Sequence, residues 1–431
     1  MAPVSEQARR RITRRLMPYV FVLYVIAYLD RVNVGYAALE MTRALNFSPE
    51  VYGFGAGIFF IGYFLLEIPG CILVEKWSAR KWIARIMISW GIIAALTGFV
   101  HSATQFYWIR FLLGVAEAGF FPGIVVYLSH WFRPAERARA LALLVIAQPI
   151  SNVIGSPLSG LLLGIRWLGI DGWRWLFIIE GIPAVIFGLV TIFYLTDWPH
   201  QAHWLSEEER RWITAELEQE RREKESMQRP SPWQALRQRE ILVLTIAYWC
   251  INASIYGFTF WLPTMLKAAS GSSNRVVTLI AALPYCVGVI AALVVGWSSD
   301  RMRERYWHTA GCMLLIAVGL ALGVAARSNL PLAVAMFCFA AFGMYGYPPS
   351  FWSLPTSFLS GTAAAASIGL INSVGNLGGF AGPYAMGYLT KLTHTYVAGV
   401  LCFAAFAGIA AALVLSVRRR PAERAAAEAV R

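Results

Sequence analysis

Long apolar stretches alternate with short polar segments along the whole chain. A membrane-spanning helix needs about 20 mostly apolar residues, because the hydrocarbon core is about 30 Å thick. Stretches of this kind cover residues 16–38, 52–74, 82–100, 105–127, 140–164, 175–196, 240–266, 276–297, 308–326, 330–352, 364–389 and 395–417. The pattern therefore predicts an all-α polytopic membrane protein with twelve transmembrane helices.

Composition and charge support this interpretation. Of the 431 residues 58% are hydrophobic and only 14% are charged, whereas soluble chains have about 25% charged residues. The net charge of +13 would be compatible with nucleic-acid binding in a soluble protein. Here the basic residues stand at the ends of apolar stretches, so we expect a lipid bilayer as partner and no nucleic acid.

Lysines and arginines occur in alternating loops, which sets the predicted orientation. They occupy the N-terminal segment before residue 16, the loops after the second, fourth and eighth stretches, and the C-terminal segment after residue 417. The first stretch has no small-residue cleavage site, so it is expected to remain as a helix. We predict a multi-pass protein of the inner (plasma) membrane with both termini in the cytoplasm.

A polar segment, residues 197–239, separates two groups of six apolar stretches. Ser206 and Glu209 have the spacing of a capping box, and the apolar positions that follow have the period of an amphipathic helix. We expect three regions: a six-helix bundle at 1–196, a cytoplasmic linker with one helix at 197–239, and a second bundle at 240–431.

The two groups of six resemble each other. Glu75 and Asp300 lie in similar loops, 225 positions apart, and Pro157 and Pro383 lie 226 positions apart. A shared offset indicates an internal duplication, and transporters built from two repeats hold their site between them.

Ionisable residues inside the apolar stretches are the main candidates for function, because each costs about 2.5–3.5 kcal/mol at the bilayer centre. All lie in the first half: Asp30, Arg31, Glu67, Arg110, Glu117 and Glu180. A carboxylate can carry a proton, and an arginine fork can hold a carboxylate ligand. Asp30, Arg31, Arg110 and Glu117 thus suit an anion–proton symporter, although ion pairs that only lock helices together would use the same residues.

The other two carboxylates are interpreted as structural. We expect Glu67 to pair with a loop base and Glu180 to be a packing link near Arg174. Neutral polar candidates could be ligands or packing residues: Tyr28, Tyr63, Gln148, Asn152, Tyr256, Trp352, Asn372 and Asn376.

Other function classes lack the residues they need. The sequence has no nucleophile with a base and no metal cluster that would favour an enzyme. His200 and His203 are interpreted as solvated, so no metal and no catalytic residue is predicted. The linker is too short to fold as the output domain of a receptor.

Three motifs resemble the major facilitator superfamily, and more narrowly its anion:cation symporter branch. They are Tyr28-Leu29-Asp30-Arg31-Val32-Asn33, Arg110-Phe111-Leu112-Leu113-Gly114-Val115-Ala116-Glu117-Ala118-Gly119, and Asn372-Ser373-Val374-Gly375-Asn376-Leu377-Gly378-Gly379. The branch includes carriers for tartrate, sugar acids and aromatic acids. The resemblance covers the whole chain.

The resemblance also implies roles for individual residues. Asp30 and Glu117 match proton-coupling carboxylates, Arg31 a substrate-binding arginine and Arg110 a gating or coupling arginine near Glu117. Tyr28, Tyr63, Gln148 and Asn376 match polar positions around the bound anion. Tyr256, Trp352 and Asn372 complete the predicted substrate site.

Two cytoplasmic loops match the gating loops of the family. The second contains Asp300 and Arg301 and is intact. The first contains Glu75 and Arg80 but departs from the pattern, since Glu75-Lys76 replaces Asp-Arg and Ser78 replaces a glycine.

These observations lead to one functional expectation with open alternatives. We expect import of a small hydroxycarboxylate, such as tartrate or a sugar acid, by proton symport and alternating access. Trp352 and Tyr256 would equally suit an aromatic acid, and an anion exchanger or an exporter of amphipathic compounds has the same fold. Apart from the coupling proton we expect no cofactor, and the resemblance implies a monomer.

Overall fold

A computed structural model describes residues 3–226, 237–355 and 361–418 of the chain. Nearly all of these residues are helical. The first half contains α1 (Val4–Ala44), α2 (Pro49–Lys76), α3 (Ala79–Leu96), α4 (Ala103–Glu117), α5 (Phe120–Ser129), α6 (Pro134–Leu162) and α7 (Gly172–Tyr194). The second half contains α10 (Arg239–Ser270), α11 (Asn274–Met302), α12 (Tyr306–Ala325), α13 (Leu330–Phe351), α14 (Gly361–Asn376), α15 (Gly378–Thr393) and α16 (Val397–Ser416).

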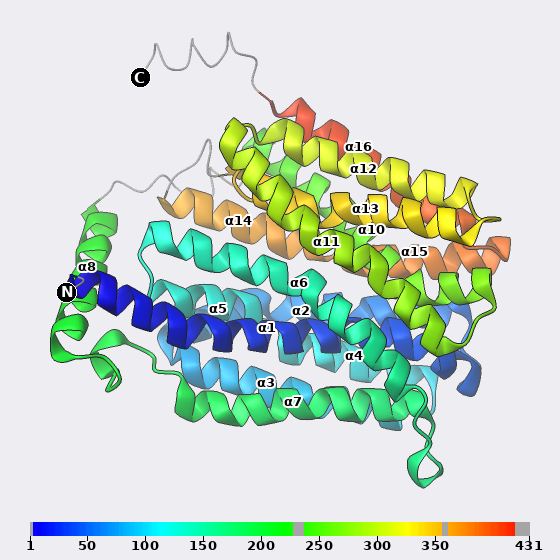
Figure 1. Ribbon diagram of the computed structural model, residues 1–431, viewed down its shortest axis with the longest axis horizontal. Coiled ribbons are helices and arrows are strands. Elements are labelled where there is room, and N and C mark those ends of the chain that lie inside the picture. The colour runs from blue at the N-terminus through cyan, green and yellow to red at the C-terminus, as the bar shows by residue number, and fades with distance from the viewer. Residues whose placement is uncertain (1–2, 227–236, 356–360, 419–431) are drawn as a thin grey trace.

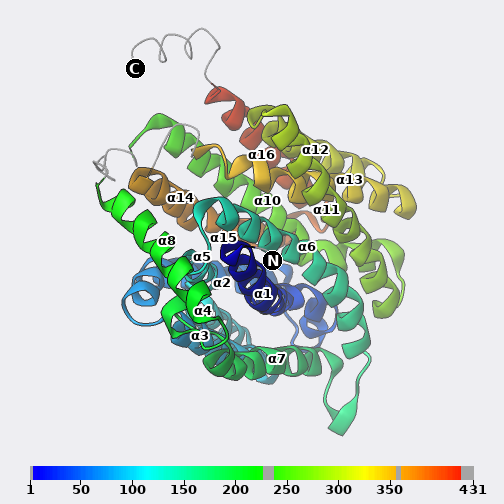
Figure 2. The same cartoon turned by 60° about the vertical axis from the view of Figure 1, so that its left-hand side comes forward.

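The long helices lie side by side along one axis (Figure 1). Helices α1 to α7 group together, as do α10 to α16, and the groups meet where α2 packs on α15, α6 on α11 and α1 on α10. We call the end near the N-terminus and α8 (Glu207–Ser226) the linker end, and the opposite end the far end (Figure 2). The division into two bundles remains a prediction, which this arrangement matches.

Two predicted spans are not single helices. The span predicted at 105–127 breaks between α4 and α5 at Gly119, whose φ of +85° strains any residue with a Cβ. The span predicted at 364–389 breaks between α14 and α15 at Leu377. Eleven of the described helical segments are long and apolar enough to cross a membrane, and α14 and α15 are each too short alone. With each broken pair counted as one crossing, the described helices supply twelve.

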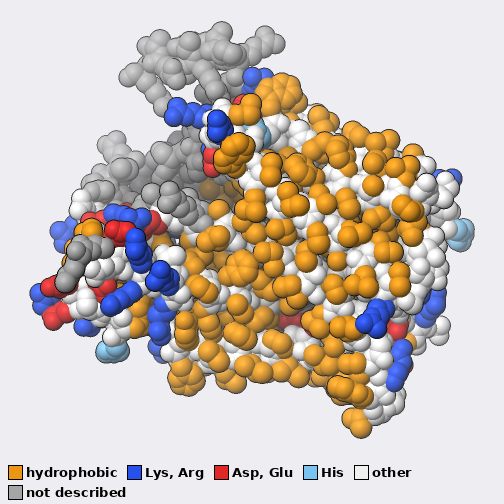
Figure 3. Space-filling model, in the orientation of Figure 1, with side chains coloured by type: hydrophobic (Ala, Val, Ile, Leu, Met, Phe, Trp, Pro, Cys, Tyr) orange, Lys and Arg blue, Asp and Glu red, His pale blue; other side chains and the backbone are white. Residues whose placement is uncertain are grey.

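The surface agrees with a bilayer environment. Exposed apolar side chains cover the body of the helices, whereas Lys and Arg side chains gather at the linker end beside α8 (Figure 3). Side chains such as Leu161 and Phe193 are largely exposed on these faces. Such an apolar belt is incompatible with water and matches lipid.

The linker helix begins as predicted. The Ser206 backbone N–H donates to the Glu209 carboxylate at 2.8 Å, and the Glu209 N–H donates to the Ser206 hydroxyl at 3.2 Å. This reciprocal pair satisfies two free helix donors. Ion pairs then fasten α8 to the first half: Arg11–Glu209 at 2.9 Å, Arg133–Glu216 at 3.1 Å and Arg137–Glu220 at 3.4 Å.

Candidate functional site

The charged residues predicted to face the bundle interior are all buried. Relative exposure is 2% for Asp30, 9% for Arg31, 0% for Arg110 and 1% for Glu117. They come from α1 and α4, which pass through the middle of the first half. Charges so far from solvent need partners, so their contacts decide what the site can do.

Arg31 and Glu117 form a buried ion pair between α1 and α4. The side chains are only 11% and 2% exposed. A second guanidinium nitrogen of Arg31 donates to the Tyr256 hydroxyl of α10 at 3.4 Å. Arg31 therefore connects the buried charged residues of α1 and α4 to the second half.

Aromatic rings enclose the Arg31 guanidinium. Its central carbon lies 5.0 Å from the ring centre of Tyr28, 5.5 Å from that of Phe59 and 5.4 Å from that of Tyr63. Ring faces attract a cation and restrict its movement. The cage thus restricts the orientation of the planar guanidinium.

Asp30 has a different partner from its neighbour Arg31. The indole N–H of Trp90, on α3, donates to one Asp30 oxygen at 2.6 Å, and Trp90 is 0% exposed. The other Asp30 oxygen is buried without a hydrogen-bond partner among the described residues. Adjacent helix positions point about 100° apart, so Asp30 faces α3 while Arg31 faces α4.

Arg110 does not pair with Glu117 in this conformation. One guanidinium nitrogen donates to the Ala56 carbonyl oxygen at 3.5 Å, and the group lies 5.2 Å from the Phe59 ring centre. Arg110 was expected near Glu117, but it forms no ion pair with it, because Glu117 pairs with Arg31. Arg110 and Arg31 lie against the same ring, that of Phe59.

Gln148 is connected to the aromatic cage through the side chain of Tyr24. Its side-chain amide donates to the Tyr24 hydroxyl at 3.4 Å, and the Tyr24 ring centre lies 5.2 Å from that of Tyr28. Asn152, one turn further along α6, donates to the Gln148 carbonyl oxygen at 3.1 Å. Gln148 is thus placed at the edge of the site, whereas Asn152 stabilises its own helix.

Glu67 joins the two halves, which corrects the expectation that it pairs with a loop base. The Asn372 amide of α14 donates to the Glu67 carboxylate of α2 at 2.5 Å. Ser373 and Asn376 also lie within hydrogen-bonding reach of this carboxylate. Glu67 is only 3% exposed, so the two asparagines contact a buried carboxyl group of the protein itself.

Trp352 lies away from the Arg31 cage. Its ring packs edge-on against Tyr248 with centres 4.9 Å apart, and against Phe351 at 5.4 Å. Of the two aromatic residues expected to flank a ligand, only Tyr256 contacts Arg31. Tyr256 also packs on Phe60 of α2 at 4.4 Å, so it lies on the boundary between the halves.

The predicted gating loops bind within their own halves. In the first, the Arg80 backbone N–H donates to Asp197 at 2.9 Å, and the Ser78 hydroxyl donates to the same carboxylate at 2.8 Å. The hydroxyl of Ser78, at a position where the family pattern has a glycine, therefore forms a hydrogen bond with Asp197. The side chain of Glu75 lies outside the described residues.

The second loop has a similar arrangement. Asp300 pairs with Arg305 at 2.7 Å, and the Arg301 guanidinium lies 5.4 Å from the Trp297 ring centre. Both contacts are local.

Three contributors were not predicted from the sequence. The sequence analysis did not single out Trp90 or Tyr24, and it placed Asp197 in the linker. Ser159 of α6 donates to Glu180 of α7 at 3.3 Å, whereas Arg174, expected near Glu180, binds the Gly98 carbonyl oxygen at 2.7 Å. No spacing in the sequence links Trp90 to Asp30, because the two residues lie on different helices.

Comparisons with known proteins agree with this architecture. Residues 20–383 match the family model described as Major Facilitator Superfamily. A protein of Agrobacterium vitis named "Putative tartrate transporter" is 44% identical over 97% of this chain and 96% of its own length. The "Quinolone resistance transporter" of Acinetobacter baumannii is 40% identical over 91% of this chain and 90% of its own.

A solved structure shares the fold. It is a bacterial homolog of the human lysosomal transporter Spinster, in an inward-facing and unoccupied conformation, with a TM-score of 0.75 and 18% identity. It covers 98% of this chain and 100% of its own. Together with the twelve crossings and the buried charges of α1 and α4, these matches show that the chain is a transporter that belongs to the Major Facilitator Superfamily and fits its anion:cation symporter type.

Proposed function

We propose that the protein imports a small organic anion together with protons, with Arg31 as the anion-binding cation and Glu117 and Asp30 as proton carriers. The observation that carries the proposal is the buried Arg31–Glu117 ion pair at the boundary of the two halves. An incoming carboxylate needs the same guanidinium fork that Glu117 occupies. Substrate and Glu117 therefore compete for one cation.

Protonation resolves this competition. A protonated Glu117 is neutral and no longer satisfies Arg31, whose charge would then be buried without compensation. A carboxylate ligand restores the balance, so proton and anion binding favour each other. The Tyr28 and Tyr63 rings and the Tyr256 hydroxyl stay in place to hold the fork and the ligand.

The same site would change its accessibility as the halves move. In this conformation the far end is closed: the Tyr52 hydroxyl of α2 donates to the Phe260 carbonyl oxygen at 2.8 Å, and the Ser156 hydroxyl of α6 donates to the Thr278 carbonyl oxygen at 2.5 Å. The basic residues gathered at the linker end favour a cytoplasmic location for that end by the positive-inside rule. The far end would then be the closed, outer side.

Two substrate classes fit the site to different degrees. Similarity to the Agrobacterium vitis protein favours a hydroxydicarboxylate such as tartrate. The aromatic cage and similarity to the Acinetobacter baumannii protein favour an aromatic carboxylate, or export of an amphipathic compound with one. We place tartrate and sugar acids first, because Tyr256 supplies a hydroxyl beside the arginine and Gln148 a polar group at the edge of the site.

Uptake into proteoliposomes tests the proposal. The purified protein would be given labelled tartrate, galactonate and an aromatic acid, with a proton gradient directed inward. Accumulation of one acid that a protonophore abolishes is the expected result. Exchange that ignores the gradient would refute proton symport, and outward movement of only the aromatic compound would favour the exporter.

A further inference from the structure

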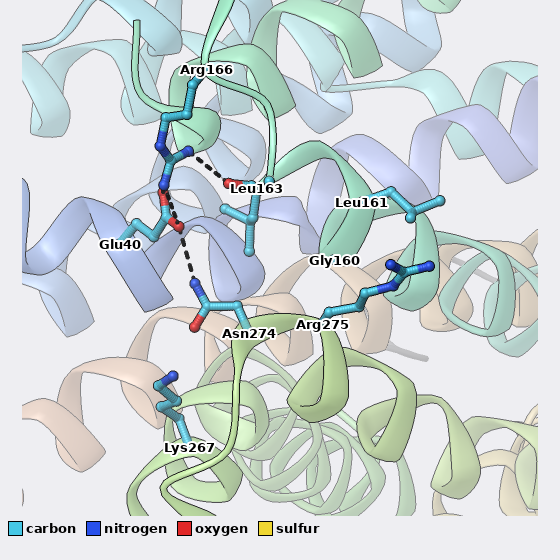
Figure 4. A pocket seen from close by; sticks show the side chains of 9 residues that line it. Glu40, Gly160, Leu161, Leu163, Arg166, Lys267, Asn274 and Arg275 are labelled. Carbon is cyan, nitrogen blue, oxygen red and sulfur yellow. Dashed lines mark hydrogen bonds and ion pairs between the residues drawn. The ribbon is translucent and has the colours of Figure 1, made fainter.

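A second cationic cavity lies at the far end, away from Arg31. Its volume is about 400 Å³, and both halves line it (Figure 4). Glu40 and Arg166 come from the first half, and Lys267, Asn274 and Arg275 from the second. The volume is within the range of sites that bind small molecules.

The charges of this cavity are unbalanced. Glu40 is the one carboxylate among its lining residues, against three cationic side chains. Its carboxylate accepts hydrogen bonds from Arg166 at 3.1 Å and from the Asn274 amide at 3.1 Å. Glu40 therefore neutralises one cation and at the same time connects the halves.

The two cationic residues that the second half contributes to the cavity, Lys267 and Arg275, have N–H donors that are not used in hydrogen bonds to the described residues. The Lys267 ammonium donates to the Ser272 carbonyl oxygen at 2.6 Å, which uses one of its three hydrogens. The Arg275 side chain forms no hydrogen bond or ion pair with the described part of the chain. Lys267 thus keeps free donors at the space between the halves, and the Arg275 guanidinium, which points away from Glu40 and Arg166 to the side of Leu161 (Figure 4), adds a second positive charge at its edge.

We propose that this cavity is a second anion site, which takes a small dianion such as sulfate or a dicarboxylate and holds the far end closed when occupied. Arg166 belongs to the first half, and Lys267 and Arg275 to the second. A dianion that contacts both sides bridges them, and opening the far end removes one side of the site. Binding follows from the cavity alone, whereas its effect on transport rests on the proposed alternating access.

Thermal unfolding of the full-length protein in lipid nanodiscs tests the binding. Sodium sulfate is compared with sodium chloride at equal ionic strength, and unfolding is followed by tryptophan fluorescence. Sulfate is expected to raise the unfolding midpoint saturably. The double variant Lys267→Gln/Arg275→Gln should need at least about tenfold more sulfate, because two charged donors are lost.

Two control variants make the result specific. Arg327→Gln removes an exposed arginine at the same end that does not line the cavity, and should respond like the wild type. Arg31→Gln should also keep the sulfate effect. An unchanged response in the double variant, no saturable shift in the wild type, or loss of the shift in Arg31→Gln would each overturn the second site.

A distance measurement tests the closure without any transport assay. Spin labels at Arg43→Cys and Arg327→Cys, in a background without other cysteines, report the separation of the halves at the far end. Sulfate should enrich the shorter distance, and Lys267→Gln/Arg275→Gln should abolish that change. Distances that ignore sulfate while the thermal shift persists would overturn the closure, and neither readout depends on which acid is carried.

Discussion

Replacement of Glu117 by Gln separates substrate binding from proton coupling. The amide has nearly the shape of the carboxylate, so packing between α1 and α4 should be retained. It cannot neutralise Arg31, and it cannot bind and release a proton. In this conformation the guanidinium would keep its contacts with the Tyr256 hydroxyl and the three rings around it.

The size of the effect follows from the ion pair. Each proton carried down a gradient of one pH unit supplies about 1.4 kcal/mol, which corresponds to about tenfold accumulation of substrate. In Glu117→Gln the Arg31 fork is free whatever the pH, so the cycle loses the proton carried by Glu117 and the accumulation ratio should fall about tenfold at a gradient of one pH unit. In the wild type, the substrate must displace the charged hydrogen bond between Arg31 and Glu117, which is worth about 1.5–3 kcal/mol. The variant lacks this bond, so substrate binding should be tighter by about tenfold or more.

Proteoliposomes allow both quantities to be measured on one preparation. Counterflow exchange reports binding and movement without a gradient, and uptake under an imposed gradient reports coupling. Glu180→Gln is the matched control, because Glu180 is also a buried carboxylate, at 5% exposure, but is bound by Ser159. It should accumulate substrate like the wild type.

Two outcomes would refute the reasoning. Normal accumulation by Glu117→Gln would show that the coupling proton binds elsewhere. Loss of exchange together with accumulation, in protein that still elutes as a single folded species, would show that the Arg31–Glu117 pair is required for the structure of the site.

The remaining predictions concern residues that position the site. Trp90→Phe removes the only donor described for the Asp30 carboxylate, a hydrogen bond of about 1.5–3 kcal/mol, so uptake should fall about tenfold and the thermal midpoint should fall with it; normal uptake would contradict this. Gly114→Ala should abolish folded expression in a fluorescence-detected elution assay, because its Cβ would lie 1.9 Å from a backbone oxygen of α2, whereas Gly408→Ala, with nothing within 4 Å, should express normally. Asn372→Leu should lower the thermal midpoint by removing one donor from the buried Glu67 carboxylate, and adding Glu67→Met should restore it; failure of that rescue would argue against a cross-half hydrogen bond.

The sequence predicts the crossings well because lipid imposes a strong and simple pattern. Apolar length alone located every described crossing, and the capping box located the start of α8. The two breaks were missed, because a glycine in an apolar stretch is also compatible with a continuous helix. Gly119 also approaches Gly70 so closely that a Cβ on Gly119 would lie 3.2 Å from the Gly70 Cα. That approach depends on the neighbouring helix, which the pattern of a single stretch does not describe.

Partner choice was the part that the sequence could not provide. Arg110 and Glu117 are seven positions apart and so lie on one face of a helix, but Glu117 pairs with Arg31 of another helix. In the same way, the Glu67 side chain finds Asn372, 305 positions away. Spacing describes one helix at a time, whereas ion pairs across helices depend on how those helices are packed.

The unequal distribution of charge between the halves has a mechanical consequence. The ionisable groups of the central site belong to α1, α2 and α4, and the second half contributes neutral donors and acceptors, Tyr256 and Asn372. A hydrogen bond between a neutral and a charged group is worth about 1.5–3 kcal/mol, whereas separating a buried ion pair costs about 3–5 kcal/mol. The strong Arg31–Glu117 pair therefore stays within one half when the halves move. Under the proposed alternating access, the described contacts across the centre of the boundary would exchange at lower cost than the ion pair, so protonation and ligand binding, and not the motion itself, would decide when that pair opens.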